Sequence, residues 1–396
     1  MKAYLNNINW IKVIGMLLGA ATLQVFLLQV YSGHFTVSGM GAYLGQIVTT
    51  NKAPAYWNLL LTFFAHQPLF SVVLLGLVML ACVVGLFFSS SPIYPLLSSA
   101  LYASFWLSNL GSPGSWLFEL LFPALFSLIV ALAQWDIRQY STSKSSWLGH
   151  KVLPSKNNIV SGVIAVILLL MFSYFNYLSK NGGENVIAVT ALFSVLTALI
   201  TYCSLSLDIR CSEIDHSLLQ RVNRKYLFLM ASTIGLMLIY QVNADISLNW
   251  FTSEGYKHLV DTYQKTSNAP EFVKSFLALS ASISSTLAPT QFVFESLAAL
   301  CLFVGIFRAP MYWLTTGLLG LLMVIEFGIP ATWQPTPTSP VNWVWELMLP
   351  TLVLAICSVH ATVEVFESKS IRQLIFGNQL FTEVSIATKA LIAGSI

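Results

Sequence analysis

The chain has 396 residues, of which 56% are hydrophobic and only 9% are charged. A soluble globular protein carries about 25% charged residues, so this composition excludes a water-facing surface over most of the molecule. The net charge of +3 is scattered, and no basic segment of the kind that binds nucleic acid is present in the sequence.

Apolar runs of membrane-spanning length recur along the chain. A helix needs about 20 mainly apolar residues to cross a bilayer, and the runs are continuous rather than alternating, as barrel strands would be. The sequence therefore predicts an all-α polytopic membrane protein with about ten transmembrane helices. The predicted spans are 11–31, 67–88, 95–110, 115–135, 158–178, 186–206, 226–242, 289–307, 311–328 and 342–360.

The basic residues predict the orientation. With the N-terminus inside and ten alternating spans, fourteen of the 19 Lys and Arg residues fall on the cytoplasmic side. We therefore expect a protein of the bacterial inner membrane, surrounded by membrane lipids, with both termini in the cytoplasm. The run 11–31 is expected to stay as a span, because it is too long for a signal peptide and lacks a small-residue cleavage site.

Two external segments, 32–66 and 243–288, connect predicted spans. The second holds most of the external acidic residues, including Asp245. Within it, Asn268-Ala-Pro270 predicts a break, followed by a short helix from Glu271 to about Ser282.

An internal repeat is visible in the sequence. The segment WLFELLFP starting at Trp116 recurs as WVWELMLP starting at Trp343, and Trp, Glu, Leu and Pro coincide without any gap between the two segments. Other landmarks pair in the same order, Ala53-Pro54 with Ala269-Pro270 and Gly85 with Gly305.

The repeat predicts the domain organisation. Each copy would start and end inside, so the copies are parallel four-helix repeats rather than inverted ones. The predicted domains are a first repeat at 1–137, an intervening two-span segment at 138–221, a second repeat at 222–362 and an amphipathic cytoplasmic tail at 363–396.

Carboxylates within spans are costly to bury and are therefore functional candidates. Glu119 and Glu346 hold equivalent positions near the external ends of the fourth spans of the two repeats. Glu295 and Glu326 lie in the second and third spans of the second repeat. Each is either a proton-handling or ligand-binding group or a hydrogen-bond anchor of the bundle. Arg308 follows Glu295 and has no basic counterpart in the first repeat.

The tryptophans at the span ends allow two interpretations. Trp116, Trp343 and Trp345 flank the external ends of the fourth spans. They form either an interface belt or the frame of a quinone ring. The five cysteines have no metal-binding spacing, and the Gly-rich turns contain no nucleotide-binding motif.

The second repeat resembles the DoxX/DoxD-like four-span membrane proteins. The resemblance rests on Trp250-Phe251, on Ala269-Pro270-Glu-Phe272, on Glu295 followed by Gly305-Ile-Phe-Arg308, and on the Trp-rich last span with Glu346. It covers roughly 240–362, and 40–136 more weakly. The intervening pair of spans has no place in the plan of that family.

This resemblance implies a membrane subunit of a quinone-linked oxidoreductase complex, with a redox or periplasmic protein as partner. It implies roles for Glu295, Arg308 and Glu346, and quinone is the expected ligand. Two alternatives stay open at this point: a non-enzymatic scaffold or assembly factor, and a transporter of a small molecule or lipid.

Overall fold

The computed structural model describes residues 8–31, 33–51, 53–108, 118–140, 216–247, 249–266, 271–326 and 344–368. These residues form twelve α-helices and no β-strand, so the predicted all-α class is confirmed. The predicted spans 158–178 and 186–206, and the residues from 369 to the C-terminus, lie outside the described part of the chain.

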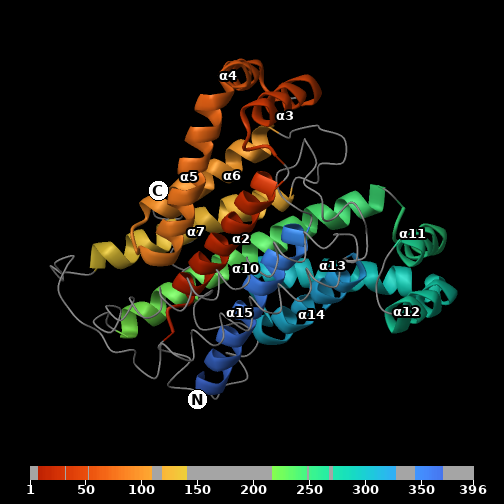
Figure 1. The fold of residues 1–396 in the computed structure, drawn as a ribbon. Helices are drawn as coiled ribbons and strands as arrows, with labels where there is room; N and C mark the ends of the chain where they lie inside the picture. Colours follow the sequence, from red (N-terminus) through yellow and green to blue (C-terminus); the bar gives the residue numbers. More distant parts are fainter. Residues whose placement is uncertain are drawn as a thin grey trace, which may run out of the picture.

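The helices form two sets of six in chain order (Figure 1). The first set is α2 (Trp10–Tyr31), α3 (Val37–Thr50), α4 (Ala55–His66), α5 (Pro68–Phe88), α6 (Ile93–Ser108) and α7 (Phe118–Tyr140). The second set is α10 (His216–Ser247), α11 (Ser253–Thr266), α12 (Glu271–Ser282), α13 (Ser284–Val304), α14 (Arg308–Glu326) and α15 (Val344–Ser368).

Six described helices are long and apolar enough to cross a membrane, namely α2, α5, α7, α10, α13 and α15. This is the signature of an integral membrane protein. The expected number of about ten spans is not confirmed. The predicted span 95–110 corresponds to α6, whose 16 residues reach only about 24 Å, short of a hydrocarbon core of about 30 Å. In α14, Arg308 and Glu326 bound an uncharged stretch of about 17 residues, the lower limit for a span.

The middle helices of the two sets have matching lengths. α3 and α11 each have 14 residues, α4 and α12 have 12, and α5 and α13 have 21. The predicted short helix after Pro270 is confirmed, because α12 runs from Glu271 to Ser282. Gly85 and Gly305, paired as landmarks in the sequence, are not equivalent here: Gly85 lies inside α5, whereas Gly305 is the residue after α13.

The turn after the first helix is also the same in both sets. Gly33 and Asn249 both have positive φ angles, of 78° and 60°. Three residues later, the hydroxyl of Thr36 accepts a hydrogen bond from the backbone N–H of Gly39, and Thr252 accepts one from Gly255. Each threonine caps the N-terminus of the short helix that follows. Aligning Gly33 with Asn249 therefore defines a register between the two sets, called the repeat register below.

A glycine lies at the crossing of the first and fourth helices in each set. A Cβ atom on Gly19 of α2 would lie 3.0 Å from the ring of Phe87 on α5. A Cβ atom on Gly235 of α10 would lie 2.5 Å from the backbone nitrogen of Phe303 on α13. Gly19 and Gly235 are equivalent in the repeat register, and small residues at such crossings let membrane helices approach closely.

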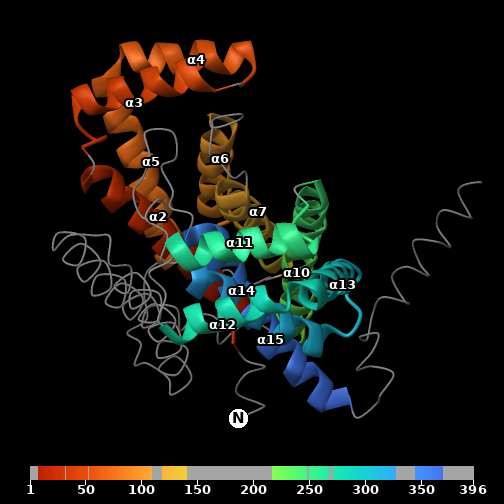
Figure 2. The same cartoon turned by 90° about the vertical axis from the view of Figure 1, so that its right-hand side faces the viewer.

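The packing places the two sets side by side. α2 packs on α5 and α6 on α7, as α10 packs on α13 and α14 on α15, while α7 contacts both α10 and α15. The main core lies among α2, α7, α10 and α15. The short helices form two lobes outside it, α3 with α4 at the top of Figure 1 and α11 with α12 at the right (Figures 1 and 2).

Candidate functional site

The described side chains cover only part of the predicted site. Glu119 lies in the first turn of α7, and Trp345 and Glu346 lie in the first turn of α15. Their side chains, and both Trp116 and Trp343 as a whole, lie outside the described residues. The predicted roles of these five residues therefore stay predictions.

Glu295 is a buried carboxyl group within a membrane span. It lies in the middle of α13 and only 8% of it is exposed. Its Oε1 accepts a hydrogen bond of 2.6 Å from Nε2 of Gln291, one helical turn earlier. A single amide donor leaves other lone pairs of the carboxyl group available for a further partner.

Asp245 is a second buried carboxyl group, which the sequence placed in an external segment. In the structure α10 continues beyond the apolar run 226–242 to Ser247, and Asp245 lies on this helix with 5% exposure. Gln241 donates a hydrogen bond of 2.8 Å to Oδ1 of Asp245. The helix ends just beyond, where Asn249 adopts its positive φ angle.

These two acidic residues form one polar cluster. α10 packs along α13, and Asp245 and Glu295 lie within electrostatic range of each other. Both acids have a glutamine four residues earlier, which donates to the carboxyl group. Carboxyl groups are costly to bury in a helix bundle of this kind, so both residues are functional candidates.

An aromatic pair adjoins the cluster. Phe292, on α13 one turn before Glu295, meets Phe251 edge to face with 5.1 Å between the ring centroids. Phe251 follows Trp250, whose backbone N–H donates to the carbonyl of Asp245 at 3.0 Å. Phe292 is 36% exposed, so the aromatic pair reaches the surface of the helix bundle.

The first set has different chemistry at the equivalent positions. In the repeat register, Gln29 corresponds to Asp245 and Met79 to Glu295. Gln29 contacts Nδ1 of His34 through its side-chain oxygen, and the ring of His34 stacks on Tyr43 with centroids 4.7 Å apart. Partial burial lowers the pKa of His34 from its usual 6.5. Among the described residues, the first set therefore has no carboxyl group at either of the positions that Asp245 and Glu295 occupy in the second set.

Arg308 lies far from Glu295. It starts α14 beyond the end of α13, so about 14 Å of helix separates Glu295 from that end. Its Nε donates to the carbonyl of Gly305 at 3.1 Å, and its guanidinium group lies 4.6 Å from the ring centroid of Phe228. The structure therefore places Arg308 and Glu295 in different parts of the second set, and the predicted roles of the two residues stay predictions.

Arg308 has a structural counterpart in the first set, although the sequence predicted none. Nζ of Lys12 donates to the carbonyl of Ser89 at 3.0 Å. Ser89 and Gly305 are the C-cap residues of α5 and α13, and they are equivalent in the repeat register. In each set a cation thus donates to the C-cap carbonyl of the equivalent span. Lys12 comes from α2 and Arg308 from α14, and this contact explains Arg308 as an anchor of the helix end.

Further ion pairs tie the helices together at the same end of the bundle. Nζ of Lys225 on α10 donates to Asp136 on α7 at 2.9 Å, and the hydroxyl of Tyr226 donates to the same carboxylate at 2.5 Å. Arg224 pairs with Glu364 on α15. These groups lie near the start of α10, opposite the end that leads into the α11–α12 lobe.

No family model, curated protein or solved structure matches the chain. Among the described residues no group of three or more His, Cys, Asp or Glu side chains could hold a metal ion. The interpretation of the Asp245–Glu295 cluster therefore rests on its own geometry.

Proposed function

We propose that this protein is an integral membrane subunit that binds a quinone between α10 and α13, with Asp245 and Glu295 as the groups that handle protons. The observation that carries the proposal is the buried pair of carboxyl groups, each with a glutamine donor, beside an aromatic pair that reaches the lipid-facing surface. A quinone needs hydrogen-bond partners for its carbonyl oxygens and an apolar environment for its ring and tail.

The chemistry of quinone reduction fits two acids better than one. Reduction of a quinone to a quinol takes up two electrons and two protons, one proton at each oxygen. Asp245 and Glu295 would each pass one proton to a quinone oxygen and be reprotonated from the aqueous side, since Asp245 lies near the end of its helix. The two electrons would come from a partner protein with a flavin or metal centre, so the chain would be a subunit of an oxidoreductase complex.

The arrangement in the membrane belongs to the same proposal. Two parallel repeats with both termini in the cytoplasm, as expected from the sequence, would put both lobes on the external face of a bacterial inner membrane. The matching helix lengths, turns and glycine crossings support the repeat. The cations Lys12, Arg224, Lys225 and Arg308 lie at the end of the bundle opposite the lobes, which supports the orientation.

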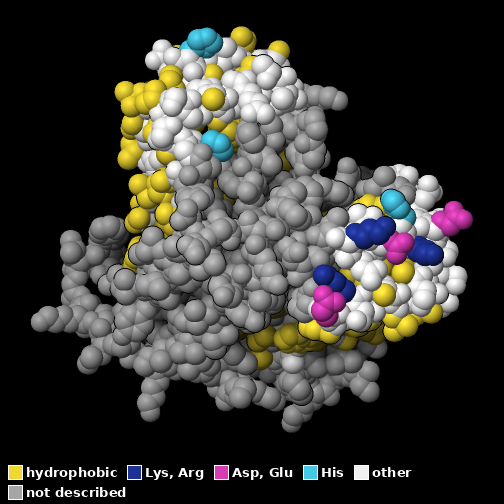
Figure 3. Space-filling model, turned by 45° about the vertical axis from the view of Figure 1, so that its right-hand side comes forward, with side chains coloured by type: hydrophobic (Ala, Val, Ile, Leu, Met, Phe, Trp, Pro, Cys, Tyr) yellow, Lys and Arg dark blue, Asp and Glu magenta, His cyan; other side chains and the backbone are white. Residues whose placement is uncertain are grey.

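One observation favours a second candidate function, that of a scaffold for other proteins. Charged side chains gather on the α11–α12 lobe, as Figure 3 shows, whereas the described part of the α3–α4 lobe has no Lys, Arg, Asp or Glu. A charged external lobe is suited to holding a soluble partner through complementary charges. In the oxidoreductase proposal, the same lobe would receive the electron donor.

The test exchanges residues between the equivalent positions of the two sets. Glu295→Met and Asp245→Gln introduce the residues that the first set has there, so both variants are expected to fold. The matched control is Glu271→Gln, which changes an exposed carboxylate on α12. Each protein is purified in mild detergent, and the quinone that it retains is extracted and measured per mole of protein.

We expect the wild type and Glu271→Gln to retain quinone, and both site variants to lose most of it. Wild-type protein that retains only phospholipid would contradict the proposal. If that protein also co-purifies with partners lacking redox centres, the scaffold function is supported instead. Retention of quinone by all variants would show that the protein binds quinone at another place and would exclude this site.

A further inference from the structure

The outer helix of each lobe exposes a row of large apolar side chains. On α4, Leu59 is 73% exposed, and on α12, Phe272 is 74% exposed. The exposed rows consist of Tyr56, Leu59, Leu60 and Phe63 on α4 and of Phe272, Phe276 and Leu279 on α12. Three pairs are equivalent in the repeat register, Tyr56 with Phe272, Leu60 with Phe276 and Phe63 with Leu279. The two lobes thus expose the same side of their equivalent outer helices, α4 and α12.

The opposite side of each outer helix is already used. Leu61 of α4 packs into a small core with Met40, Tyr43 and Ile47 of α3. On α12, Val273, Leu277 and Ala281 pack against Val260 of α11. Each outer helix is therefore apolar on two sides, and α3 or α11 covers only one of them.

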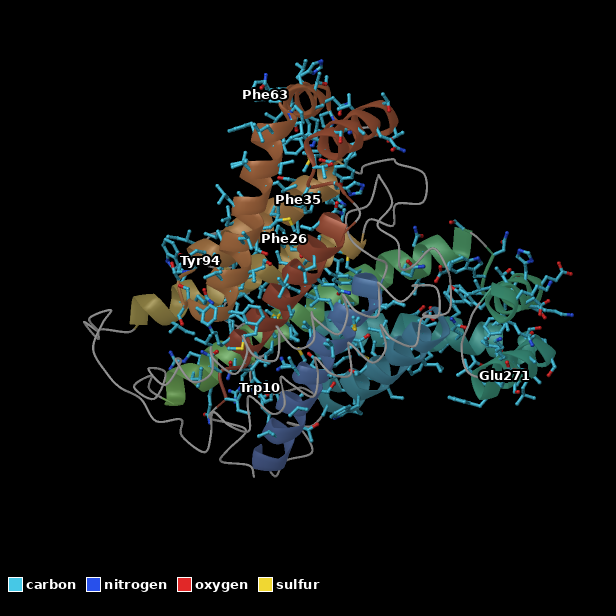
Figure 4. All side chains as sticks on the ribbon, viewed as in Figure 1. Trp10, Phe26, Phe35, Phe63, Tyr94 and Glu271 are labelled. Carbon is cyan, nitrogen blue, oxygen red and sulfur yellow. The ribbon has the colours of Figure 1, made fainter. Side chains whose placement is uncertain are left out.

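The exposed rows continue onto the membrane spans. α4 leads through Gln67 into α5, where Leu69, Phe70, Val73 and Leu77 are exposed. α12 leads through Ile283 into α13, where Val293, Leu297 and Leu300 are exposed. In Figure 3 the hydrophobic side chains form a band from the upper lobe down the edge of the molecule, and Figure 4 shows Phe63 at the outer margin of that lobe. The side chains on α5 and α13 face lipid in an integral membrane protein.

We propose that α4 and α12 lie in the plane of the membrane at the lobe end of the bundle, with their exposed apolar rows buried at the boundary between lipid head groups and acyl chains. Continuity with the lipid-facing sides of α5 and α13 identifies lipid as the occupant. An amphipathic helix with one apolar side adopts this position when it reaches a bilayer. α3 and α11 then lie above it on the aqueous side, where α11 places Glu254, Lys257 and His258 in water.

The test measures which solvent surrounds each row. Spin labels are attached to single cysteines, Phe63→Cys on α4 and Leu279→Cys on α12, in protein reconstituted into phosphatidylcholine–phosphatidylglycerol vesicles. Cys203 and Cys211 are replaced by serine, whereas Cys82, Cys301 and Cys357 are buried and can remain. The parent protein without an introduced cysteine measures background labelling.

Matched controls come from the inner helix of each lobe. Gln46→Cys on α3 and Lys257→Cys on α11 replace exposed polar residues. Collision rates of each label with oxygen, which concentrates in lipid, and with a water-soluble nickel chelate are compared. The logarithm of the oxygen-to-nickel ratio is expected to be positive at 63 and 279 and negative at 46 and 257.

Two outcomes would overturn the proposal. Labels at 63 and 279 that collide with the nickel chelate as often as the control labels would place the rows in water. Labels shielded from both reagents would show that protein covers the rows, either a second copy of this chain or a co-purified partner. Quinone content plays no part in this measurement, so its result is independent of the proposed function.

Discussion

The crossing of α10 and α13 at Gly235 allows a quantitative test of the fold. In a Gly235→Ala variant the new Cβ atom would lie 2.5 Å from the backbone nitrogen of Phe303, 2.8 Å from the carbonyl oxygen of Ala299 and 2.9 Å from Cβ of Leu302. These atoms are fixed by α13 itself, so no side-chain rotation relieves the overlap. The two helices must therefore move apart.

The expected loss follows from two opposing terms. Overpacking of a well-packed interior costs about 1–3 kcal/mol, and contact with backbone places Gly235→Ala at the upper end. Alanine is favoured over glycine within a helix by about 1 kcal/mol. We therefore expect a net loss of about 2 kcal/mol in the free energy of unfolding.

Reversible unfolding in mixed micelles with increasing SDS, followed by circular dichroism, measures this loss. Gly19→Ala should lose less, because the nearest atoms there are side-chain atoms of Phe87 at 3.0 Å, whereas the added Cβ at 235 would lie 2.5 Å from backbone. Gly317→Ala is the matched control, since no atom lies within 4 Å of the added Cβ, and the helix preference for alanine should leave it at least as stable as the wild type. A Gly235→Ala variant as stable as Gly317→Ala would refute the close approach of α10 and α13.

Three further effects follow from named contacts. Asp136→Ala removes the acceptor of both Tyr226 and Lys225 and should lower stability in the same assay by about 1–2 kcal/mol; an unchanged value would mean that α7 and α10 are held without these contacts. Thr22→Val removes the bond of 3.1 Å to the hydroxyl of Tyr102 and should cost about 1 kcal/mol, a loss that Thr49→Val on exposed α3 should not show. Because burial lowers the pKa of His34 below its usual 6.5, the unfolded state binds its proton first, so stability should fall as the pH drops through and below that value. His34→Gln should have a weaker dependence on pH over this range, and an identical dependence would assign the titration to another group.

The local features of the fold could be predicted from the sequence where one strong signal dominates. The apolar run 67–88 predicted α5 to within one residue, and Pro270 predicted the start of α12 at Glu271. The end of α10 could not be read from hydropathy. Gln241 and Asp245 are polar, yet they bond to each other along the helix and extend it to Ser247.

Only one of the two acidic residues of the candidate site could be predicted from the sequence. Glu295 was recognisable because it interrupts an apolar run. Asp245 was not, because its burial depends on α13, which comes much later in the chain. A glutamine four residues before each acid, at 241 and at 291, was the available signal. The pairing of Arg308 with Lys12 as equivalent anchors was also beyond sequence comparison, since the two cations come from different helices.

Photoaffinity labelling of the wild-type protein would show whether a quinone binds between α10 and α13, as proposed. An azido-quinone is photolysed with native membranes, and labelled peptides are mapped by mass spectrometry with and without an excess of unmodified quinone. A quinone bound between α10 and α13 should give labelling, suppressed by competitor, on peptides that contain Asp245 to Phe251 and Gln291 to Glu295. Labelling spread over the lipid-facing sides of α5 and α13, and insensitive to competitor, would contradict it.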